Sequence, residues 1–155
     1  MTLCGAVMAE YEREEEKPME VMIDAIGTGA GCADRLIELG LPARAINVSE
    51  APSMGSGYLN LRAELWYKAR EWLESRTVKI PHDSRLIDEL TTPRYQYTSS
   101  GKVKIESKED LKRRKVKSPD SADAFVLTFA GVASSAMGGL GSRGRTPLKR
   151  GLSLV

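Results

Sequence analysis

The stretch from Val21 to Val48 restricts the possible folds of this chain more than any other part of the sequence. VMIDAI is an apolar run typical of a buried strand, and three glycines follow it in GTGAG. The next residues predict a helix over Cys32–Leu39 and then a second strand, ARAINV, over Ala43–Val48. Strand, glycine turn, helix and strand in this order form a right-handed unit with parallel strands, so the sequence predicts an α/β fold.

Downstream of this unit the sequence predicts mostly helices. The clearest one covers Leu59–Ser75, where apolar side chains form a stripe at helical spacing. Trp66 and Trp72 lie in this helix, and we expect them in the core or at an interface rather than as stacking platforms for bases. The sequence also predicts a helix over 6–16, a short helix over Ser84–Leu90, and a hairpin of Tyr95–Ser99 with Lys102–Ile105. A basic helix over Ser107–Arg114, capped by Ser107, follows. The last predicted helix is buried, is capped by Ser118, starts with Pro119 and runs to Ser134.

Length and composition favour one globular domain. The chain has 155 residues, of which 41% are hydrophobic and 28% are charged. No apolar run reaches the roughly 18 residues that cross a bilayer, which argues against a membrane partner. Cys4 and Cys32 lack the spacing of metal ligands, which favours reduced thiols in an intracellular protein. We expect a domain over residues 1–137 and a disordered, basic, Gly/Ser-rich tail over residues 138–155.

Charge is distributed unevenly along the chain, although the net charge is only +2. Residues 10–20 are mostly acidic, whereas KEDLKRRKVK, over residues 108–117, is mostly basic. This basic segment is either a solvated helix face or a surface that contacts nucleic acid. The candidates for DNA contact are Lys108, Lys112, Arg113, Arg114, Lys115 and Lys117.

Asp24 is unusual because it follows three apolar residues in a strand that should be covered on both faces. A buried, ionised carboxylate is costly unless it is paired or bound to a cation, and open α/β sheets bind ligands at the carboxyl ends of their strands. Asp24 is therefore either a ligand of a cation or an acid that hydrogen-bonds the glycine turn. A dinucleotide site is a weaker alternative, because Cys32 stands where the G-x-G-x-x-G pattern needs its last glycine, and Glu50 matches the ribose-binding acid only loosely.

Asp120 and Asp123 are three residues apart, so they share one face of the last helix. Asp120 is explained as an acid at a helix start, whereas Asp123 lies between two alanines just before the apolar run. Carboxylates at a sheet edge favour Mg²⁺ or Mn²⁺ over zinc, and a pair of such ions hydrolyses phosphodiesters. We therefore predict that Asp24, Asp120 and Asp123 converge on one cation. The single histidine, His82, precedes Asp83 in a predicted loop and is interpreted as a surface residue.

Four sequence blocks together resemble a known family. DAIGTGAGCADRL, YLNLRAELWYKAREWL, GKVKIESKEDLKRR and SPDSADA are similar in order and spacing to the nuclease domain of tailed-phage terminase large subunits. The resemblance implies an RNase H-like fold and a Mg²⁺- or Mn²⁺-dependent endonuclease that cuts double-stranded viral DNA during packaging, in the cytoplasm of a bacterial host and together with other terminase or portal components. It places two family acids on Asp24 and Asp123, with Asp120 as a neighbour that assists the metal.

The chain departs from this family at its beginning. The family's domain opens with strands that carry another essential aspartate, whereas this chain has no aspartate before Asp24. We therefore expect a truncated domain, such as a prophage remnant, with an incomplete sheet and very weak cleavage. Three readings stay open: a nuclease domain, a nucleotide-binding βαβ module, and a non-catalytic remnant that binds DNA or protein.

Overall fold

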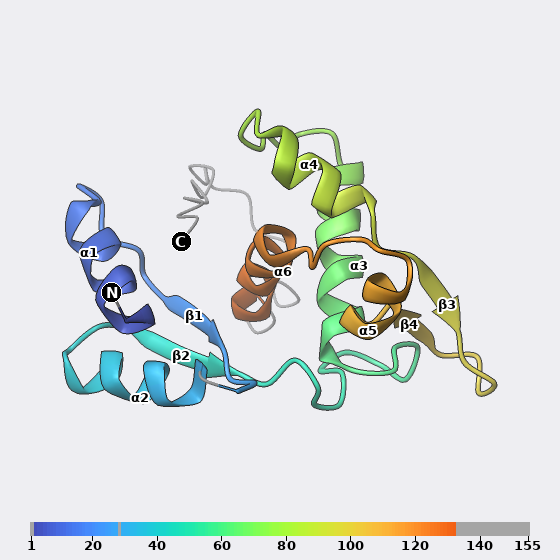
Figure 1. The fold of residues 1–155 in the computed structure, drawn as a ribbon, viewed down its shortest axis with the longest axis horizontal. Coiled ribbons are helices and arrows are strands. Elements are labelled where there is room, and N and C mark those ends of the chain that lie inside the picture. Colours follow the sequence, from blue (N-terminus) through green and yellow to red (C-terminus); the bar gives the residue numbers. More distant parts are fainter. Residues whose placement is uncertain (1, 28, 133–155) are drawn as a thin grey trace, which may run out of the picture.

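The computed structural model describes residues 2–27 and 29–132 (Figure 1). In chain order its elements are α1 (Leu3–Arg13), β1 (Val21–Asp24), α2 (Gly29–Glu38), β2 (Ala43–Ile46), α3 (Leu61–Glu74), α4 (Ser84–Thr91), β3 (Tyr95–Tyr97), β4 (Val103–Ile105), α5 (Lys108–Arg113), α6 (Asp120–Leu127) and the 3₁₀ helix η1 (Thr128–Val132). The predicted tail over residues 138–155, and the part of the last helix beyond residue 132, lie outside the described residues. None of the described helices has the length and apolarity needed to span a membrane.

The predicted βαβ unit is confirmed. Strands β1 and β2 pair in parallel, with Val21 opposite Ala43 and Asp24 opposite Ile46. Helix α2 starts earlier than the predicted Cys32, because its first residue, Gly29, lies directly against the end of β1. A Cβ at Gly29 would overlap the backbone carbonyl of Asp24, so only glycine permits this approach.

Helices α1 and α2 form a small hydrophobic core with the parallel strands. Ile23, Ala33 and Leu36 are buried there, and α1 packs against them with half-buried side chains that include Val7 and Tyr11. Both cysteines are free thiols, and burial raises the pKa of Cys32 to about 11, with Cys4 beside it contributing further.

The main core surrounds α6, which lies between the parallel strands and α3 and contacts both (Figure 1). Trp66 is buried in this core, and Trp72 packs against the rings of Phe125 and Phe129 at centroid distances of 6.0 and 5.8 Å. The prediction that both tryptophans lie in the core or at an interface is therefore confirmed, with Trp72 partly buried against the core. Buried Glu64 fastens the preceding Gly/Ser-rich loop to α3, because its carboxylate accepts hydrogen bonds from Ser53 and Met54.

The hairpin and the basic helix also form as predicted. Strands β3 and β4 pair antiparallel, and Ser107 caps α5 by accepting a hydrogen bond from the backbone of Asp110. The predicted cap of the last helix is wrong. Pro119 is the N-cap residue of α6, and the carboxylate of Glu89 on α4 accepts hydrogen bonds from the first backbone N–H groups, those of Ser121 and Ala122, at 2.7 and 3.1 Å.

Candidate active site around Asp123

Asp123 lies in the first turn of α6, where its side chain is 22% exposed. One of its carboxylate oxygens, Oδ1, accepts three hydrogen bonds from α3. Arg62 donates two, from Nε at 3.2 Å and Nη2 at 2.9 Å, and Trp66 donates one from Nε1 at 3.1 Å. This oxygen is therefore fully used within the protein, while the second oxygen, Oδ2, has only the Lys108 ammonium near it among the described residues.

The two donors come from one face of α3. Arg62 and Trp66 are four residues apart, so their side chains lie one above the other on the helix. The Arg62 guanidinium lies 5.8 Å from the centre of the Trp66 ring, and its Nη1 also donates to the backbone carbonyl of Glu106 at 2.9 Å. Each donor is thus held by a second contact, which gives the Asp123 carboxylate a defined orientation.

Lys108, at the start of α5, links Asp123 to Asp120. Its ammonium lies 3.8 Å from Oδ2 of Asp123 and 3.4 Å from Oδ1 of Asp120. The Ser118 hydroxyl donates to the same Asp120 oxygen at 2.7 Å. This hydrogen bond lowers the pKa of Asp120 below its usual range, and Lys108 lowers it further against the opposing effect of burial. The two carboxylates therefore already share one cationic group.

Asp24 does not join this pair in the structure. Its side chain is exposed at the end of β1, and Oδ1 accepts a hydrogen bond from the backbone N–H of Ile26 at 3.0 Å. This contact is the turn-stabilising role that was one of the two alternatives for Asp24. Within residues 2–27 and 29–132, no three His, Cys, Asp or Glu side chains form a group that could hold a metal ion. The expected convergence of Asp24, Asp120 and Asp123 on one cation is therefore not seen.

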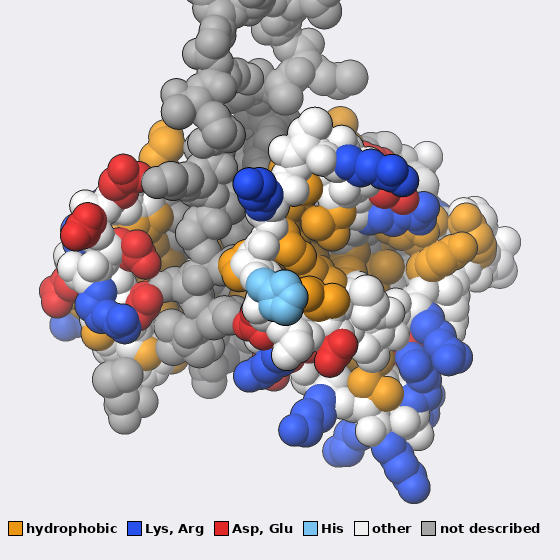
Figure 2. All heavy atoms as spheres, turned by 90° about the horizontal axis from the view of Figure 1, so that it is seen from above, with side chains coloured by type: hydrophobic (Ala, Val, Ile, Leu, Met, Phe, Trp, Pro, Cys, Tyr) orange, Lys and Arg blue, Asp and Glu red, His pale blue; other side chains and the backbone are white. Residues whose placement is uncertain are grey.

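The basic segment after β4 divides into two parts. Arg114 is structural, since its guanidinium lies 2.5 Å from the buried carboxylate of Glu106. Lys112, Arg113, Lys115 and Lys117 are exposed, as is Lys108 beside the carboxylates. Figure 2 shows that Lys and Arg side chains gather on the side of the molecule that carries α5, whereas Asp and Glu side chains gather at the opposite end, which carries α1. His82 is exposed, as expected.

The donor set at Asp120 and Asp123 fits one hard divalent cation. Mg²⁺ is commonly held by one or two carboxylates together with water and substrate phosphate. Oδ2 of Asp123 and the carboxylate of Asp120 supply such a pair, and their attraction of the Lys108 ammonium shows that the position favours positive charge. The described residues bring no third carboxylate to it, which a site for two metals would need.

The sequence did not identify Arg62 and Trp66 as site residues. Both stand in the block YLNLRAELWYKAREWL, where Trp66 was expected in the core or at an interface. A weak signal was available, because an arginine and a tryptophan four residues apart place two N–H donors on one helix face. Their target lies about sixty positions further along the chain, so no local pattern connects them.

Comparison with known proteins gives one consistent result. No protein-family model and no curated protein sequence matches the chain. Among solved structures, the nuclease domain of the large terminase subunit gp2 of bacterial virus Sf6 is similar, with a TM-score of 0.62 and 21% identity over 80% of this chain and 68% of that chain. A point mutant of the same domain with manganese and beta-thujaplicinol gives a TM-score of 0.64 and 20% identity over 83% and 73%. A third structure, of a mutant with calcium, gives 0.63 and 21% over 80% and 68%.

These matches all lie at 20–21% identity. At this level of identity they establish the fold. This chain therefore shares the fold of the terminase nuclease domain, an RNase H-like α/β architecture.

Proposed function

We propose that this protein is the nuclease domain of a phage or prophage terminase large subunit, which cuts double-stranded DNA with Mg²⁺ or Mn²⁺. The observation that carries the proposal is the arrangement of Asp123 within this fold. Arg62 and Trp66 occupy one of its oxygens and leave the other beside Asp120 and Lys108. The gp2 nuclease domain, which this chain resembles in fold, has been solved with manganese and with calcium.

Different residues of this chain would bind the metal ion, orient its ligands and contact the DNA. Asp123 and Asp120 would hold one divalent ion, and Arg62 and Trp66 orient the Asp123 carboxylate toward it. A bound ion would supply Lewis-acid stabilisation of the phosphate and activation of water. Lys108 keeps the carboxylate pair neutralised before an ion binds and can contact a DNA phosphate once an ion takes its place. The exposed cations of α5 and the residues after it would hold the DNA backbone beside the site.

The experiment is nicking of supercoiled plasmid by the full chain in a titration of Mn²⁺ and of Mg²⁺, with EDTA as the stop. Asp123→Asn keeps an oxygen for Arg62 and Trp66 but removes the charge, so the fold should persist while cleavage falls about a hundredfold or more, as for a misplaced reactive group. Asp120→Asn and Asp24→Asn test the other two candidate acids in the same way. Asp34→Asn is the matched control, since Asp34 is exposed on α2 and lies outside the site.

The outcomes separate the proposal from its alternatives. Metal-dependent nicking that is lost in Asp123→Asn and kept in Asp34→Asn supports a nuclease. Equal nicking by all variants shows a contaminant or a different site. Salt-sensitive DNA binding without nicking at any metal concentration favours a non-catalytic remnant, and a thermal shift with dinucleotide but not with Mn²⁺ favours a nucleotide-binding module.

Lys108 gives a test of metal binding that is independent of cleavage. Because its ammonium lies near both carboxylates, Lys108→Ala removes a competitor for the ion, while Arg62 stays paired with Asp123. We expect Mn²⁺ to bind at least several-fold more tightly to this variant, as measured by loss of the free-ion signal in electron paramagnetic resonance. Lys112→Ala, an exposed lysine of the same helix, should leave the affinity unchanged. Weaker binding in Lys108→Ala would contradict the assignment of the pair as the ion site.

A further inference from the structure

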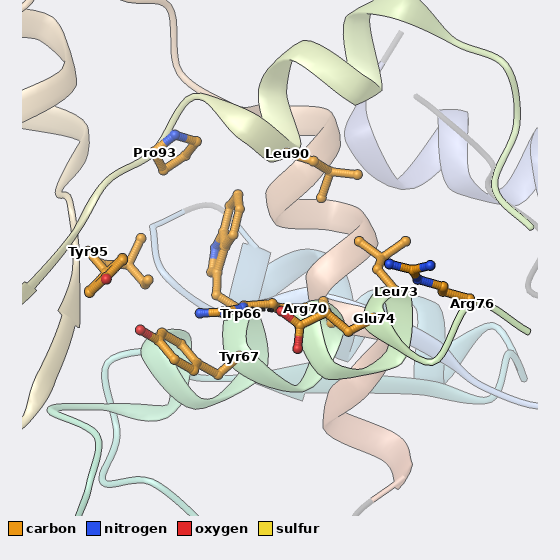
Figure 3. A pocket seen from close by; sticks show the side chains of 11 residues that line it. Trp66, Tyr67, Arg70, Leu73, Glu74, Arg76, Leu90, Pro93 and Tyr95 are labelled. Carbon is orange, nitrogen blue, oxygen red and sulfur yellow. Dashed lines mark hydrogen bonds and ion pairs between the residues drawn. The ribbon is translucent and has the colours of Figure 1, made fainter. Parts of the chain in front are cut away.

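An apolar pocket shares one residue, Trp66, with the Asp123 site. Its cavity of about 370 Å³ is within the range of small-molecule sites and is lined by residues of α3, α4 and the start of the hairpin. Figure 3 shows the Trp66 ring standing between Tyr95 and Leu90, with Leu73 further along the same wall. The lining is mostly apolar and aromatic, and the charged groups on it are Arg70, Glu74 and Arg76.

Trp66 belongs to both the pocket and the candidate active site. Its ring lines the cavity, while its Nε1 donates to Oδ1 of Asp123 at 3.1 Å. The side chain is only 8% exposed, so it cannot shift at one end without changing its contacts at the other. Anything that fills the cavity therefore touches a group that holds Asp123.

The rim of the pocket carries an arginine in an unfavourable backbone conformation. Arg76 has φ of 55°, a left-handed value that costs a residue with a Cβ about 1–2 kcal/mol and that glycine adopts freely. Its backbone N–H donates to the carbonyl of Leu73, and Figure 3 shows its guanidinium lying beside Leu73 at one end of the pocket.

The two rim arginines differ in their partners. Arg70 is paired with Glu74 at 2.8 Å, whereas Arg76 makes no ion pair with any described residue. Among the described residues the rim therefore has one positive charge without an ion-pair partner, and its guanidinium can bind an oxyanion through two parallel hydrogen bonds.

We propose that this pocket binds a planar apolar anion, with the rings of the ligand along the wall formed by Trp66 and Leu73 and its acidic group on Arg76. Aromatic walls favour flat rings, and the single unpaired guanidinium favours one carboxylate or sulfonate at one end of the ligand. Because Trp66 lines the pocket and also donates a hydrogen bond to Asp123, a ligand in the pocket changes the surroundings of the Asp123 carboxylate. A small molecule in the pocket thus affects the Asp123 site without occupying the positions of the metal ion or the DNA.

The test uses two probes with the same ring system. Anilinonaphthalene sulfonate carries the anion, and N-phenylnaphthylamine lacks it. Arg76→Gly removes the guanidinium and relieves the left-handed strain, so this variant should fold and melt at a higher temperature than the parent. We expect it to bind the sulfonate probe about tenfold more weakly, in line with the loss of a hydrogen bond to a charged group, and the neutral probe equally well.

Lys115→Gly is the matched control, because Lys115 is the other described non-glycine residue with a positive φ, of 58°. This variant also loses one positive charge and a left-handed residue, but in the segment after α5, which does not line the pocket. Its affinity for both probes should therefore equal that of the parent. Replacing Trp72 by phenylalanine keeps an aromatic ring against Phe125 and leaves Trp66 as the one fluorescent tryptophan. In this Trp72→Phe variant, the sulfonate probe should quench Trp66 emission with the affinity that probe fluorescence gives for the parent. Equal binding by Arg76→Gly and Lys115→Gly, or saturation without quenching of Trp66, would overturn the proposal.

Discussion

At the scale of single residues, the corner between β1 and α2 depends on the absence of one methyl group. A side chain at Gly29 would collide with the backbone of Asp24, whereas one at Gly31, two residues further along the same helix, would meet no atom within 4 Å. We expect Gly29→Ala to lower the free energy of unfolding by about 2–3 kcal/mol, because the strand end or the helix must shift. Gly31→Ala should raise it by about 0.5–1 kcal/mol, since alanine replaces glycine inside a helix. Urea unfolding of the two variants and the parent measures both effects. Equal effects of the two substitutions would show that α2 does not approach β1 this closely.

At the scale of elements, Glu106 joins the hairpin to the basic helix. Its side chain is 4% exposed and accepts hydrogen bonds from the backbone of Arg94, before β3, and from the guanidinium of Arg114, after α5. Burial raises the pKa of Glu106, but the hydrogen bonds from Arg114 and Arg94 outweigh burial, and the pKa lies below the usual 4.5. A carboxyl with a lower pKa in the folded chain stabilises the fold above about pH 4.5, and this contribution is lost as the pH falls through the folded-state pKa.

We expect Glu106→Gln to lower the free energy of unfolding at pH 7 by about 1–2 kcal/mol, because the charge-assisted hydrogen bond to Arg114 is lost. The difference from the parent should shrink below pH 4.5, because the unfolded parent binds a proton at this position first and the folded parent does so only at lower pH. Urea unfolding at a series of pH values measures the difference. Glu109→Gln, on the exposed face of α5, should change stability by less than about 0.5 kcal/mol. A gap between Glu106→Gln and the parent that widens on acidification would contradict the role assigned to Glu106.

At the scale of the whole molecule, the separation of charge between the α5 side and the α1 end predicts how DNA binds (Figure 2). We expect weak, sequence-independent binding whose logarithm falls linearly with the logarithm of salt concentration. Replacing Lys112, Arg113 and Lys115 by alanine should reduce the slope by up to about 3, since each phosphate contact contributes about 0.9. Arg114 is left out of this set because it holds buried Glu106, and its loss would confuse binding with unfolding.

The control for DNA binding is a second triple variant, in which Arg13, Lys17 and Arg35 are replaced by alanine. These cations are exposed on α1, on α2 and on the chain that follows α1, so the net charge changes equally in both variants. Fluorescence anisotropy with a duplex over a range of salt concentrations measures the slopes. If both variants lose the same slope, binding depends on net charge alone and the α5 side is not a DNA surface.

Much of the fold follows from local signals in the sequence. The apolar run before GTGAG, the helical spacing in Leu59–Ser75 and the serine before α5 each act within a few residues, and most predicted elements are present with ends shifted by a few positions. The last helix is an exception, because α6 ends at Leu127 and a 3₁₀ helix, η1, follows where an α-helix was predicted. The shifts have physical causes. Helix α2 begins at Gly29 because this glycine can lie against β1, and α6 is capped by Glu89 from α4 rather than by its own Ser118.

The sequence by itself therefore determined the parallel βαβ unit, the hairpin, the helices and the candidacy of Asp123, because periodicity, caps and turns act over short distances along the chain. Only the tertiary structure decided what surrounds that aspartate. Arg62 is 61 positions and Trp66 57 positions from Asp123, and these contacts exist because α3 and α6 pack around one core. The same packing leaves Asp24 at the end of β1, bonded to its own turn, because the position of a carboxylate relative to another element depends on how whole elements pack.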